Sequence, residues 1–308
     1  VRRGGREMEL TEQTAAVQRM QDYIRRWAGS DELSLEGMYA AAGYSRRHAD
    51  RLFKELLGQT PREYLQAVLL TQGAARLRDT RDPVLDIALD SRFASHEGFT
   101  RAFESRFSVA PSRYRRSPSP IPLFVQYPIR DYQALIRRKE ECQMSEEIKM
   151  CTVTVQERPR RKLLYLCSKK GKDYLSFCEE MGCEWEGLLN SIPQKMDTAA
   201  LLELPPQLVK EGCSNIAAGV ELPLDYCGEV PEGYALAQLP AGALFYFQSE
   251  PYDREEDFCL AIESVQRAVE RYRPEPFGYR FAPESGPSFN FGAEQETGAR
   301  VAVPAGSR

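Results

Sequence analysis

The chain has 308 residues, of which 42% are hydrophobic and 28% charged, as expected for a globular protein long enough to form two or more domains. It contains no run of 18 apolar residues and no apolar N-terminal stretch, so nothing indicates membrane insertion or export and we expect a cytoplasmic protein. The net charge of −4 is divided unevenly: residues 1–116 carry 20 Lys and Arg against 16 Asp and Glu, whereas the remainder carries 21 against 29.

The basic first third contains an internal repeat with a period of fifty residues. We take Met8 as its start and residues 8–116 as the first domain. The same residue type recurs in the pairs Leu35 and Leu85, Ser45 and Ser95, Arg51 and Arg101, Phe53 and Phe103, Pro61 and Pro111, and Tyr64 and Tyr114. Such a repeat indicates two copies of one supersecondary unit.

The first copy has the pattern of two helices joined by a tight turn. Gly43 can adopt the positive φ of the turn, and Ser45 is placed to cap the following helix. In that helix one face is apolar and consists of Ala49, Leu52, Phe53, Leu56 and Leu57. The other face carries Arg46, Arg47, His48, Asp50, Arg51 and Lys54. This arrangement is typical of a helix-turn-helix unit, whose second helix enters the major groove of DNA.

The second copy follows the same plan. Asp82 is predicted to cap and Pro83 to open its first helix, and Ser95 to cap its second. The second helix is expected to face inward with Phe99, Ala102, Phe103 and Phe107 and outward with His96, Glu97, Thr100 and Arg101. Between the copies, Thr60 to about Arg78 is predicted as one helix of roughly 27 Å. Because successive major-groove faces are roughly 34 Å apart, one chain could reach two adjacent groove segments.

These residues resemble the DNA-binding domain of AraC/XylS transcription regulators. The motifs LSLEGMYAAAGYSRRHADRLFKELLGQTPREYL, DIALDSRFASHEGFTRAF and APSRYRR occur in that order within residues 17–116. The resemblance implies an all-α domain of two helix-turn-helix units joined by a long helix, with double-stranded DNA as its partner. It places base-reading residues at Arg47, Asp50 and Arg51 and at His96, Glu97 and Arg101. It places phosphate contacts at Arg46, Lys54 and Thr100.

Two residues depart from the pattern of that family. Arg92 stands where the family usually has glycine, and a positive φ there would cost roughly 1 kcal/mol. Gly73 interrupts the connecting helix and would cost about 1 kcal/mol against alanine if exposed. The second helix-turn-helix copy is therefore expected to be less tightly packed than the first, or to bind mainly phosphates. The alternative interpretation is that the charged helix faces are only solvated. It is less favoured because the helix-turn-helix unit occurs twice and the family motifs occur in the expected order.

The acidic remainder has the pattern of a linker followed by an α+β domain. Residues 117–149 are predicted to be the linker, because residues 117–128 contain four prolines. A basic run of Arg158, Arg160, Arg161 and Lys162 is expected to be a solvated loop. In residues 150–308 the predicted strands are CTVTVQ, KLLYLC, ALLEL, NIAAGVEL, both ends of YALAQLPAGALFYFQ, FGYRFA, SFNFGA and ARVAVP. Helices are predicted at YLSFCEEMGCEWEGLLNSI and at residues 254–272, the latter with Phe258, Ile262, Val265 and Val269 inward.

Strand, helix and strand pair occur twice in this domain, which predicts pseudo-two-fold halves. The pieces AAGVEL, LPAGALFYFQ and ARVAVP resemble GyrI-like small-molecule-binding domains, in which two such halves enclose an aromatic pocket. The resemblance and the aromatic content place the ligand-binding residues at Tyr165, Trp185, Glu221, Phe245, Phe247, Tyr279 and Phe289. The glutamate of the family aligns with Arg300, and Glu294 and Glu296 are its other substitutes besides Glu221. For each aromatic residue alone, core packing is the alternative.

The cysteines favour reduced, mostly buried thiols over a metal site. All eight lie after residue 141, without a Cys-x-x-Cys pair or a histidine among them. We predict no metal, no cofactor and no catalytic residue.

The patterns together predict a non-enzymatic transcription regulator. It is expected to be an activator that binds promoter DNA, contacts RNA polymerase and responds to a small apolar or cationic effector. One alternative is a GyrI-like hydrolase or drug-sequestering module with an attached DNA-binding domain, which would need a carboxylate positioned on a water molecule. Another is architectural DNA binding without sequence preference, which predicts a steep salt dependence only.

Overall fold

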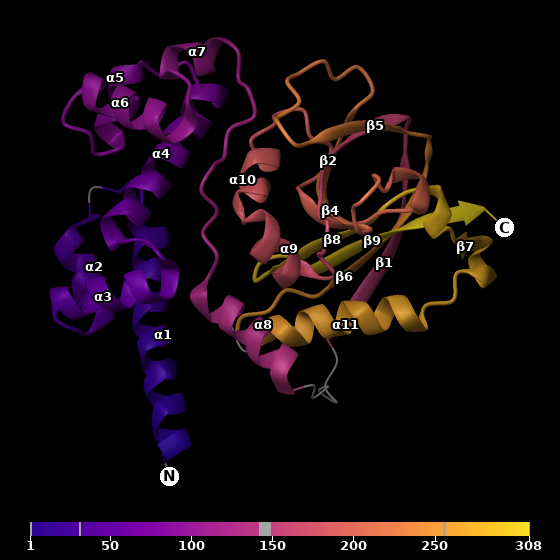
Figure 1. Ribbon diagram of the computed structural model, residues 1–308, viewed down its shortest axis with the longest axis horizontal. Helices are drawn as coiled ribbons and strands as arrows, with labels where there is room; N and C mark the ends of the chain where they lie inside the picture. Colours follow the sequence, from indigo (N-terminus) through magenta and orange to yellow (C-terminus); the bar gives the residue numbers. More distant parts are fainter. Residues whose placement is uncertain (1, 31, 142–148, 255–256, 308) are drawn as a thin grey trace. The chain divides into compact units, whose positions relative to one another are not determined.

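A computed structural model describes residues 2–30, 32–141, 149–254 and 257–307 of the chain (Figure 1). The chain divides into two compact units. The first consists of Val1–Pro118 and Leu123–Ile136, and the second of Ser119–Pro122 and Arg137–Arg308. The N-terminal unit is helical and the C-terminal unit is built on an antiparallel sheet.

The first unit contains the two predicted helix pairs and the helix between them. Its helices are α1 (Arg2–Trp27), α2 (Leu35–Ala42), α3 (Arg46–Leu57), α4 (Pro61–Asp79), α5 (Val84–Asp90), α6 (His96–Phe107), α7 (Pro111–Arg116) and the start of α8 (Ile129–Glu141). The apolar stripe of α3 is buried at Ala49, Leu52 and Phe53, where it packs with α1, α2 and α4. In α6 the phenylalanines at 99, 103 and 107 are buried as predicted.

The local signals for turns and caps have mixed outcomes. Gly43 adopts a φ of 72°, and Thr60 and Glu63 form a capping box at the start of α4, with Pro61 in its first turn. Ser45 occupies the N-cap position of α3, but its side chain makes no capping hydrogen bond. The predicted cap at Asp82 is wrong: α5 starts at Val84, and the carboxylate of Asp82 instead accepts a hydrogen bond of 2.8 Å from Arg76.

Part of the predicted linker is ordered against α1 and α4. Phe124 packs edge-on against Tyr64, with ring centroids 4.8 Å apart. Two glutamines of α1, each 1% exposed, accept hydrogen bonds from the first backbone N–H groups of α8: Gln21 from Ile129 at 2.9 Å and Gln18 from Arg130 at 3.3 Å. Because the first N–H groups of a helix have no partner within it, these side chains cap α8.

The second unit is a single curved sheet with helices on one face (Figure 1). Its strands are β1 (Cys151–Arg158), β2 (Arg161–Cys167), β3 (Ala200–Glu203), β4 (Ile216–Pro223), β5 (Ala235–Leu239), β6 (Gly242–Ser249), β7 (Tyr279–Phe281), β8 (Ser288–Glu294) and β9 (Gly298–Ser307). The strand order is β1-β6-β9-β8-β3-β4-β2-β5, and β7 pairs with β9. The helices are α9 (Tyr174–Met181), α10 (Glu184–Asn190) and α11 (Phe258–Arg271).

The two faces of the sheet have different cores. On one face, Phe177 of α9 and Trp185 and Leu189 of α10 pack against β2, β3 and β4, while α11 lies along β6, β8 and β9. The core of the other face is formed by strands and by the segment 204–209, and no α-helix of the described residues contributes to it. Because side chains alternate along a strand, Phe245 and Phe247 lie on the α11 side of β6 and Tyr246 on the other.

Within α11 the predicted inward residues are only partly buried. Phe258 and Val265 are buried, but Ile262 and Val269 are half-buried, and the buried positions include Glu263 and Ser264. The thiols are also less buried than predicted. Of the seven described cysteines, all of which are free, Cys183 and Cys227 are exposed and the others are half-buried; Cys142 lies outside the described residues.

Candidate functional sites

The outer face of α3 presents an exposed cluster of positive charge. Arg46, Arg47, Arg51 and Lys54 are exposed, whereas His48 and Asp50 are half-buried. Glu55 lies 3.8 Å from Arg51, but both side chains are more than 60% exposed, so this ion pair is weak. The predicted DNA-reading residues of the first copy therefore share one face of one helix.

Tyr39 of α2 holds two of these side chains in place. Its hydroxyl donates a hydrogen bond of 2.6 Å to Asp50, and the guanidinium of Arg46 lies 5.2 Å from the centroid of its ring. Burial and this hydrogen bond raise the pKa of Tyr39 above its usual value. Asp50 is thus engaged within the domain, and Tyr39 is a positioning residue that sequence patterns did not indicate.

The outer face of α6 is more evenly charged. His96, Glu97 and Arg101 are exposed as predicted, and Ser95 caps the helix by accepting a hydrogen bond from Gly98 N at 3.1 Å. Thr100 is half-buried and its hydroxyl oxygen is buried, so a phosphate contact would require a different rotamer. The backbone N–H groups at the start of α6 are better placed than this hydroxyl to donate hydrogen bonds to a phosphate.

The two departures from the family pattern have structural explanations. Arg92 has the positive φ of 62° that was anticipated, and its guanidinium donates a hydrogen bond of 2.6 Å to the backbone oxygen of Ser30. Gly73 is buried rather than exposed, and a methyl group there would lie 3.1 Å from the ring of Phe99 and 3.2 Å from the hydroxyl of Ser91. Glycine at this position lets α4 and α6 approach closely.

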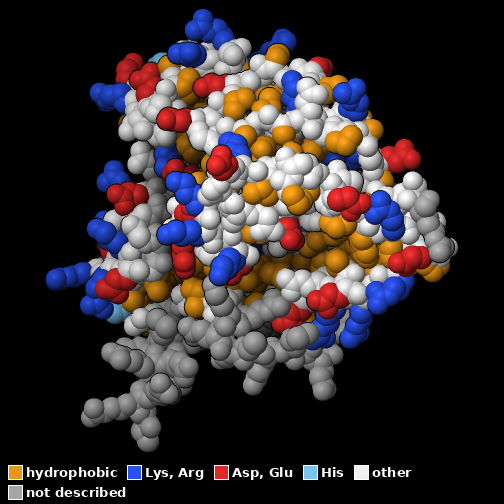
Figure 2. Space-filling view, turned by 45° about the vertical axis from the view of Figure 1, so that its right-hand side comes forward, with side chains coloured by type: hydrophobic (Ala, Val, Ile, Leu, Met, Phe, Trp, Pro, Cys, Tyr) orange, Lys and Arg blue, Asp and Glu red, His pale blue; other side chains and the backbone are white. Residues whose placement is uncertain are grey.

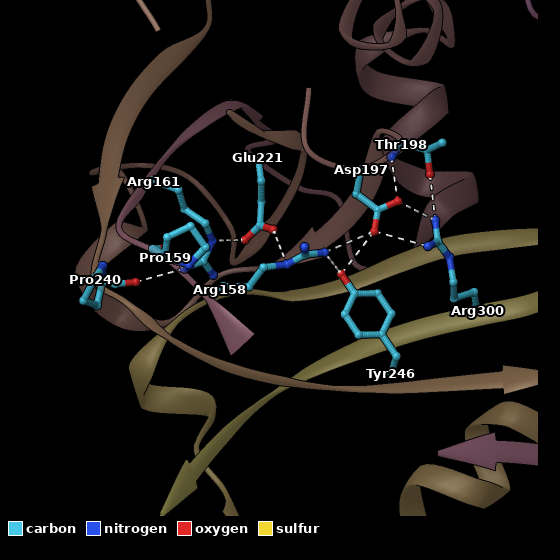
Figure 3. A network of polar contacts seen from close by, with 9 residues as sticks. All are labelled: Arg158, Pro159, Arg161, Asp197, Thr198, Glu221, Pro240, Tyr246 and Arg300. Atoms are coloured by element: carbon cyan, nitrogen blue, oxygen red, sulfur yellow. Dashed lines mark hydrogen bonds and ion pairs between the residues drawn. The ribbon is translucent and has the colours of Figure 1, made fainter. Parts of the chain in front are cut away.

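In the second unit the helix-free face of the sheet carries a network of charged side chains (Figure 3). Arg161 and Arg158 both bind Glu221, the latter with its Nε 3.3 Å from Oε2. Arg158 continues to Asp197 at 3.5 Å. Asp197 in turn holds Arg300 through two hydrogen bonds, at 2.8 and 3.2 Å.

Aromatic rings lie directly against this polar network. The hydroxyl of Tyr246 accepts a hydrogen bond from Arg158 and donates one of 3.1 Å to Asp197, and burial raises its pKa to about 12. The guanidinium of Arg300 lies 3.9 Å from the ring centroid of Phe291, which is stacked on Tyr246 with an interplanar angle of 17°. Cations over aromatic faces are stabilised by the ring quadrupole.

The seven predicted ligand residues do not lie together. Tyr165 and Phe289 belong to the core of the helix-free face, and Glu221 lies on that face at its polar end. Phe245 and Phe247 pack around Tyr272 and Phe281 on the α11 side, and Tyr279 packs against Phe245. Trp185 packs on Phe177 beneath α9. The sequence pattern predicted the strands that carry these aromatic residues, but not the face of the sheet on which each ring lies.

Sequence reasoning also missed the residues that complete the network. Arg158 and Arg161 were expected in a solvated loop, but they end β1 and begin β2, and their side chains are 13% and 6% exposed. Asp197 and Phe291 carried no motif. One signal in the sequence could have indicated the network: Arg300 stands at the position of the expected glutamate. Because a buried cation needs an anionic partner, this arginine implies a nearby carboxylate.

Outside these two sites, the surface shown in Figure 2 is mixed in character. Figure 2 shows charged side chains of both signs interspersed with exposed hydrophobic ones. A hollow of about 690 Å³ is lined by the lysines at 169, 170 and 172 and by Glu203, Ser214 and Asn215, and contains none of the predicted ligand residues. In the described parts of the chain, no group of His, Cys, Asp and Glu could hold a metal ion, and no helix is long and apolar enough to cross a membrane.

Residues 38–117 match the family model described as a helix-turn-helix domain. The chain is 44% identical over 98 residues to the right origin-binding protein of Escherichia coli strain K12, covering 32% of this chain and 34% of that protein. It is 48% identical over 85 residues to the transcriptional regulator Rob of Salmonella typhimurium, covering 28% and 29%. The chain thus covers about a third of the length of these relatives.

A solved structure, SAV2435 bound to tetraphenylphosphonium, is similar over 50% of this chain and 94% of its own, with 13% identity and a TM-score of 0.34. Residues 38–117 of the first unit thus form a helix-turn-helix domain, and the chain is similar over part of its length to an origin-binding protein and to a transcriptional regulator.

Proposed function

We propose that the whole chain is a transcription regulator that reads two adjacent major-groove segments and responds to a small molecule bound in its second unit. The observation that carries this proposal is the exposed basic face of α3, within a doubled helix-turn-helix domain. Residues 8–116 are its reader and residues 150–308 its effector domain. Activation through RNA polymerase is part of the proposal.

The strand order supports the proposed two-fold origin of the effector domain. Each half contributes one strand, a helical segment and a strand pair: β2, α9 with α10, β3 and β4 in the first, and β6, α11, β8 and β9 in the second. In the sheet these strands run β6-β9-β8 and then β3-β4-β2, so that the two halves meet at their second strands. The outer strands are exchanged, since β1 pairs with β6 and β5 with β2.

The state of Glu221 makes this residue unsuitable as the general base of the hydrolase alternative. Its two carboxylate oxygens bind Arg161 and Arg158, respectively. A general base must be free to take a proton from a water molecule within hydrogen-bond reach. A carboxylate held by two guanidinium groups, and itself 2% exposed, does not meet that requirement.

The proposal is tested by DNA binding of the full chain. We expect at least about a hundredfold preference for a duplex from the region upstream of its own gene over a shuffled duplex of equal composition, measured by fluorescence anisotropy across a salt series. Arg47→Ala and Arg101→Ala should each weaken specific binding by about 1–3 kcal/mol if the side chain reads a base. Arg280→Ala, in the second unit, is the control.

The variants also separate the two copies of the reader. Because Lys54 of α3 is assigned to a phosphate, Lys54→Ala should reduce the salt dependence, whereas Arg47→Ala and Arg101→Ala should each relax the sequence preference of their own copy. Equal affinity for the specific and shuffled duplexes, with a steep salt dependence, would instead establish architectural binding and contradict sequence reading at this promoter region.

A further inference from the structure

The charge network of the second unit contains more cations than anions. Its ionisable members are the guanidiniums of Arg158, Arg161 and Arg300 and the carboxylates of Asp197 and Glu221. The exposed fractions of these side chains range from 2% at Glu221 to 28% at Arg300. The network therefore carries a net charge of +1 in a largely desolvated place, where an uncompensated charge is costly.

Hydrogen bonding in the network shows the same imbalance. Asp197 accepts from Arg158, from Arg300, from Tyr246 and from the backbone of Thr198, so both of its oxygens are occupied. Three guanidiniums together offer about fifteen N–H donors. Among the described residues they make eight hydrogen bonds. The network has spare N–H donors, and the carboxylate of Asp197 is fully occupied, which is the arrangement an additional anion would complete.

The position that a cationic ligand would take is already filled from within the chain. Arg300 lies on the face of Phe291, is paired bidentately with Asp197 and donates a hydrogen bond of 2.9 Å to Thr198. An external cation would have to displace this side chain and would add a second unpaired positive charge. A cation is therefore the least favoured ligand for this end of the sheet.

The surroundings of Arg300 indicate the shape of the ligand. Arg300 is the most exposed member of the network, and Phe291 beside it is half-buried. Phe291 is stacked on the buried ring of Phe289 with an interplanar angle of 8°, so Phe291 is the flat apolar group beside Arg300. Guanidinium groups bind carboxylates through two parallel N–H donors and stack on planar rings.

We propose that the effector site of the second unit lies at Arg300 and takes a planar aromatic carboxylate, whose charge completes the network of Arg158, Arg161, Arg300, Asp197 and Glu221. The proposal deepens the proposed function, since it rests on this unit being the effector domain. The carboxylate binds the guanidinium donors left free, and the ring of the ligand lies against Arg300 and Phe291.

The test compares three probes that share one ring system: 2-naphthoate, 2-naphthamide and 2-naphthylmethylammonium, titrated calorimetrically into the full chain. We expect 2-naphthoate to bind at least about tenfold more tightly than the amide, equivalent to about 1.4 kcal/mol, and the ammonium compound to bind most weakly. Equal binding of the amide, tighter binding of the ammonium compound, or no binding of 2-naphthoate would overturn the proposal.

Variants locate the site. Arg300→Gln should lower the affinity for 2-naphthoate at least about tenfold, and Arg300→Lys, which keeps the charge but loses the planar fork, should have an intermediate effect. Arg280→Gln is the matched control, because Arg280 is an exposed arginine whose ion pair with Glu284 lies outside the network. Near-ultraviolet circular dichroism shows whether each variant is folded. Unchanged affinity in folded Arg300→Gln would contradict the assignment.

DNA binding is measured in the same samples with and without 2-naphthoate. If 2-naphthoate binds at Arg300 but leaves DNA affinity unchanged, the site stands and the effector role fails. If DNA is read specifically while no carboxylate binds, the reader stands and the ligand class fails. The two proposals therefore fail separately.

Discussion

At the scale of single residues, Arg92 combines a backbone cost with a side-chain gain. A non-glycine residue with a φ of 62° lies in the left-handed region, which costs roughly 1 kcal/mol relative to glycine. The hydrogen bond from its guanidinium to Ser30 ties the turn of the second copy to the segment after α1. The side chain thus offsets part of the strain that its own backbone imposes.

Two substitutions at Arg92 separate these effects. Arg92→Ala keeps the strain and loses the side chain, whereas Arg92→Gly loses both, so the glycine variant should be about 1 kcal/mol more stable than the alanine variant. Urea unfolding of the first unit can be followed by the fluorescence of Trp27 in a Trp185→Phe background. The same pair of substitutions at Arg81, an exposed residue whose φ is not positive, should not favour glycine. Equal stability of the two Arg92 variants would contradict the strain.

At the scale of elements, Gly73 shows packing overriding helix propensity. In a helix interior alanine is favoured over glycine by about 1 kcal/mol, but here the added methyl group would press on Phe99 and Ser91. We expect Gly73→Ala to gain little of that 1 kcal/mol and Gly73→Val to destabilise the first unit by about 1–3 kcal/mol through overpacking.

Gly98 supplies the comparison, because it also lies in a helix. A methyl group there would meet Ser95 only at ordinary contact distance, so Gly98→Ala should raise the free energy of unfolding by up to about 1 kcal/mol. Thermal unfolding of the three variants measures the difference. Equal stabilisation by Gly73→Ala and Gly98→Ala would show that α4 and α6 are not closely packed at Gly73.

At the scale of the whole molecule, the sequence predicted where helices and strands occur better than it predicted which of their faces come together. The fifty-residue repeat and the stripe of Ala49, Leu52 and Phe53 were enough to predict the helices of the first unit, because helix faces follow directly from spacing along the chain. The charge network of the second unit depends on which strand faces meet, and that is decided by pairing between distant segments. Arg158 and Arg300, for example, both bind Asp197 from different strands, a contact that no local pattern contains.

The connection between the units illustrates the same limit, since its proline content predicted a linker. The segment instead contributes Ile129 to the core of the first unit, and the α8 residue Asp131 lies near Arg25 and Asp22 of α1. Burial raises the pKa of Asp131 to about 6 from 3.8, against the opposing effect of Arg25 and Arg130. Its carboxyl group therefore keeps its proton to a higher pH than an ordinary aspartic acid does.

This shift predicts how the stability of the first unit depends on pH. Because the pKa of Asp131 is higher in the folded state, the contribution of the proton is fully present below pH 3.8 and is lost as the pH rises through about 6. Asp131→Asn, which stays neutral, should therefore stabilise the first unit by about 1–2 kcal/mol at pH 7.5, after allowance for partial exposure, and the gain should disappear near pH 4. Urea unfolding of both proteins at the two pH values measures it, with Asp225→Asn in the second unit as the control. A gain that does not change with pH would show that Asp131 titrates normally, and a loss at pH 7.5 would mean that its charge binds Arg25 strongly enough to outweigh burial.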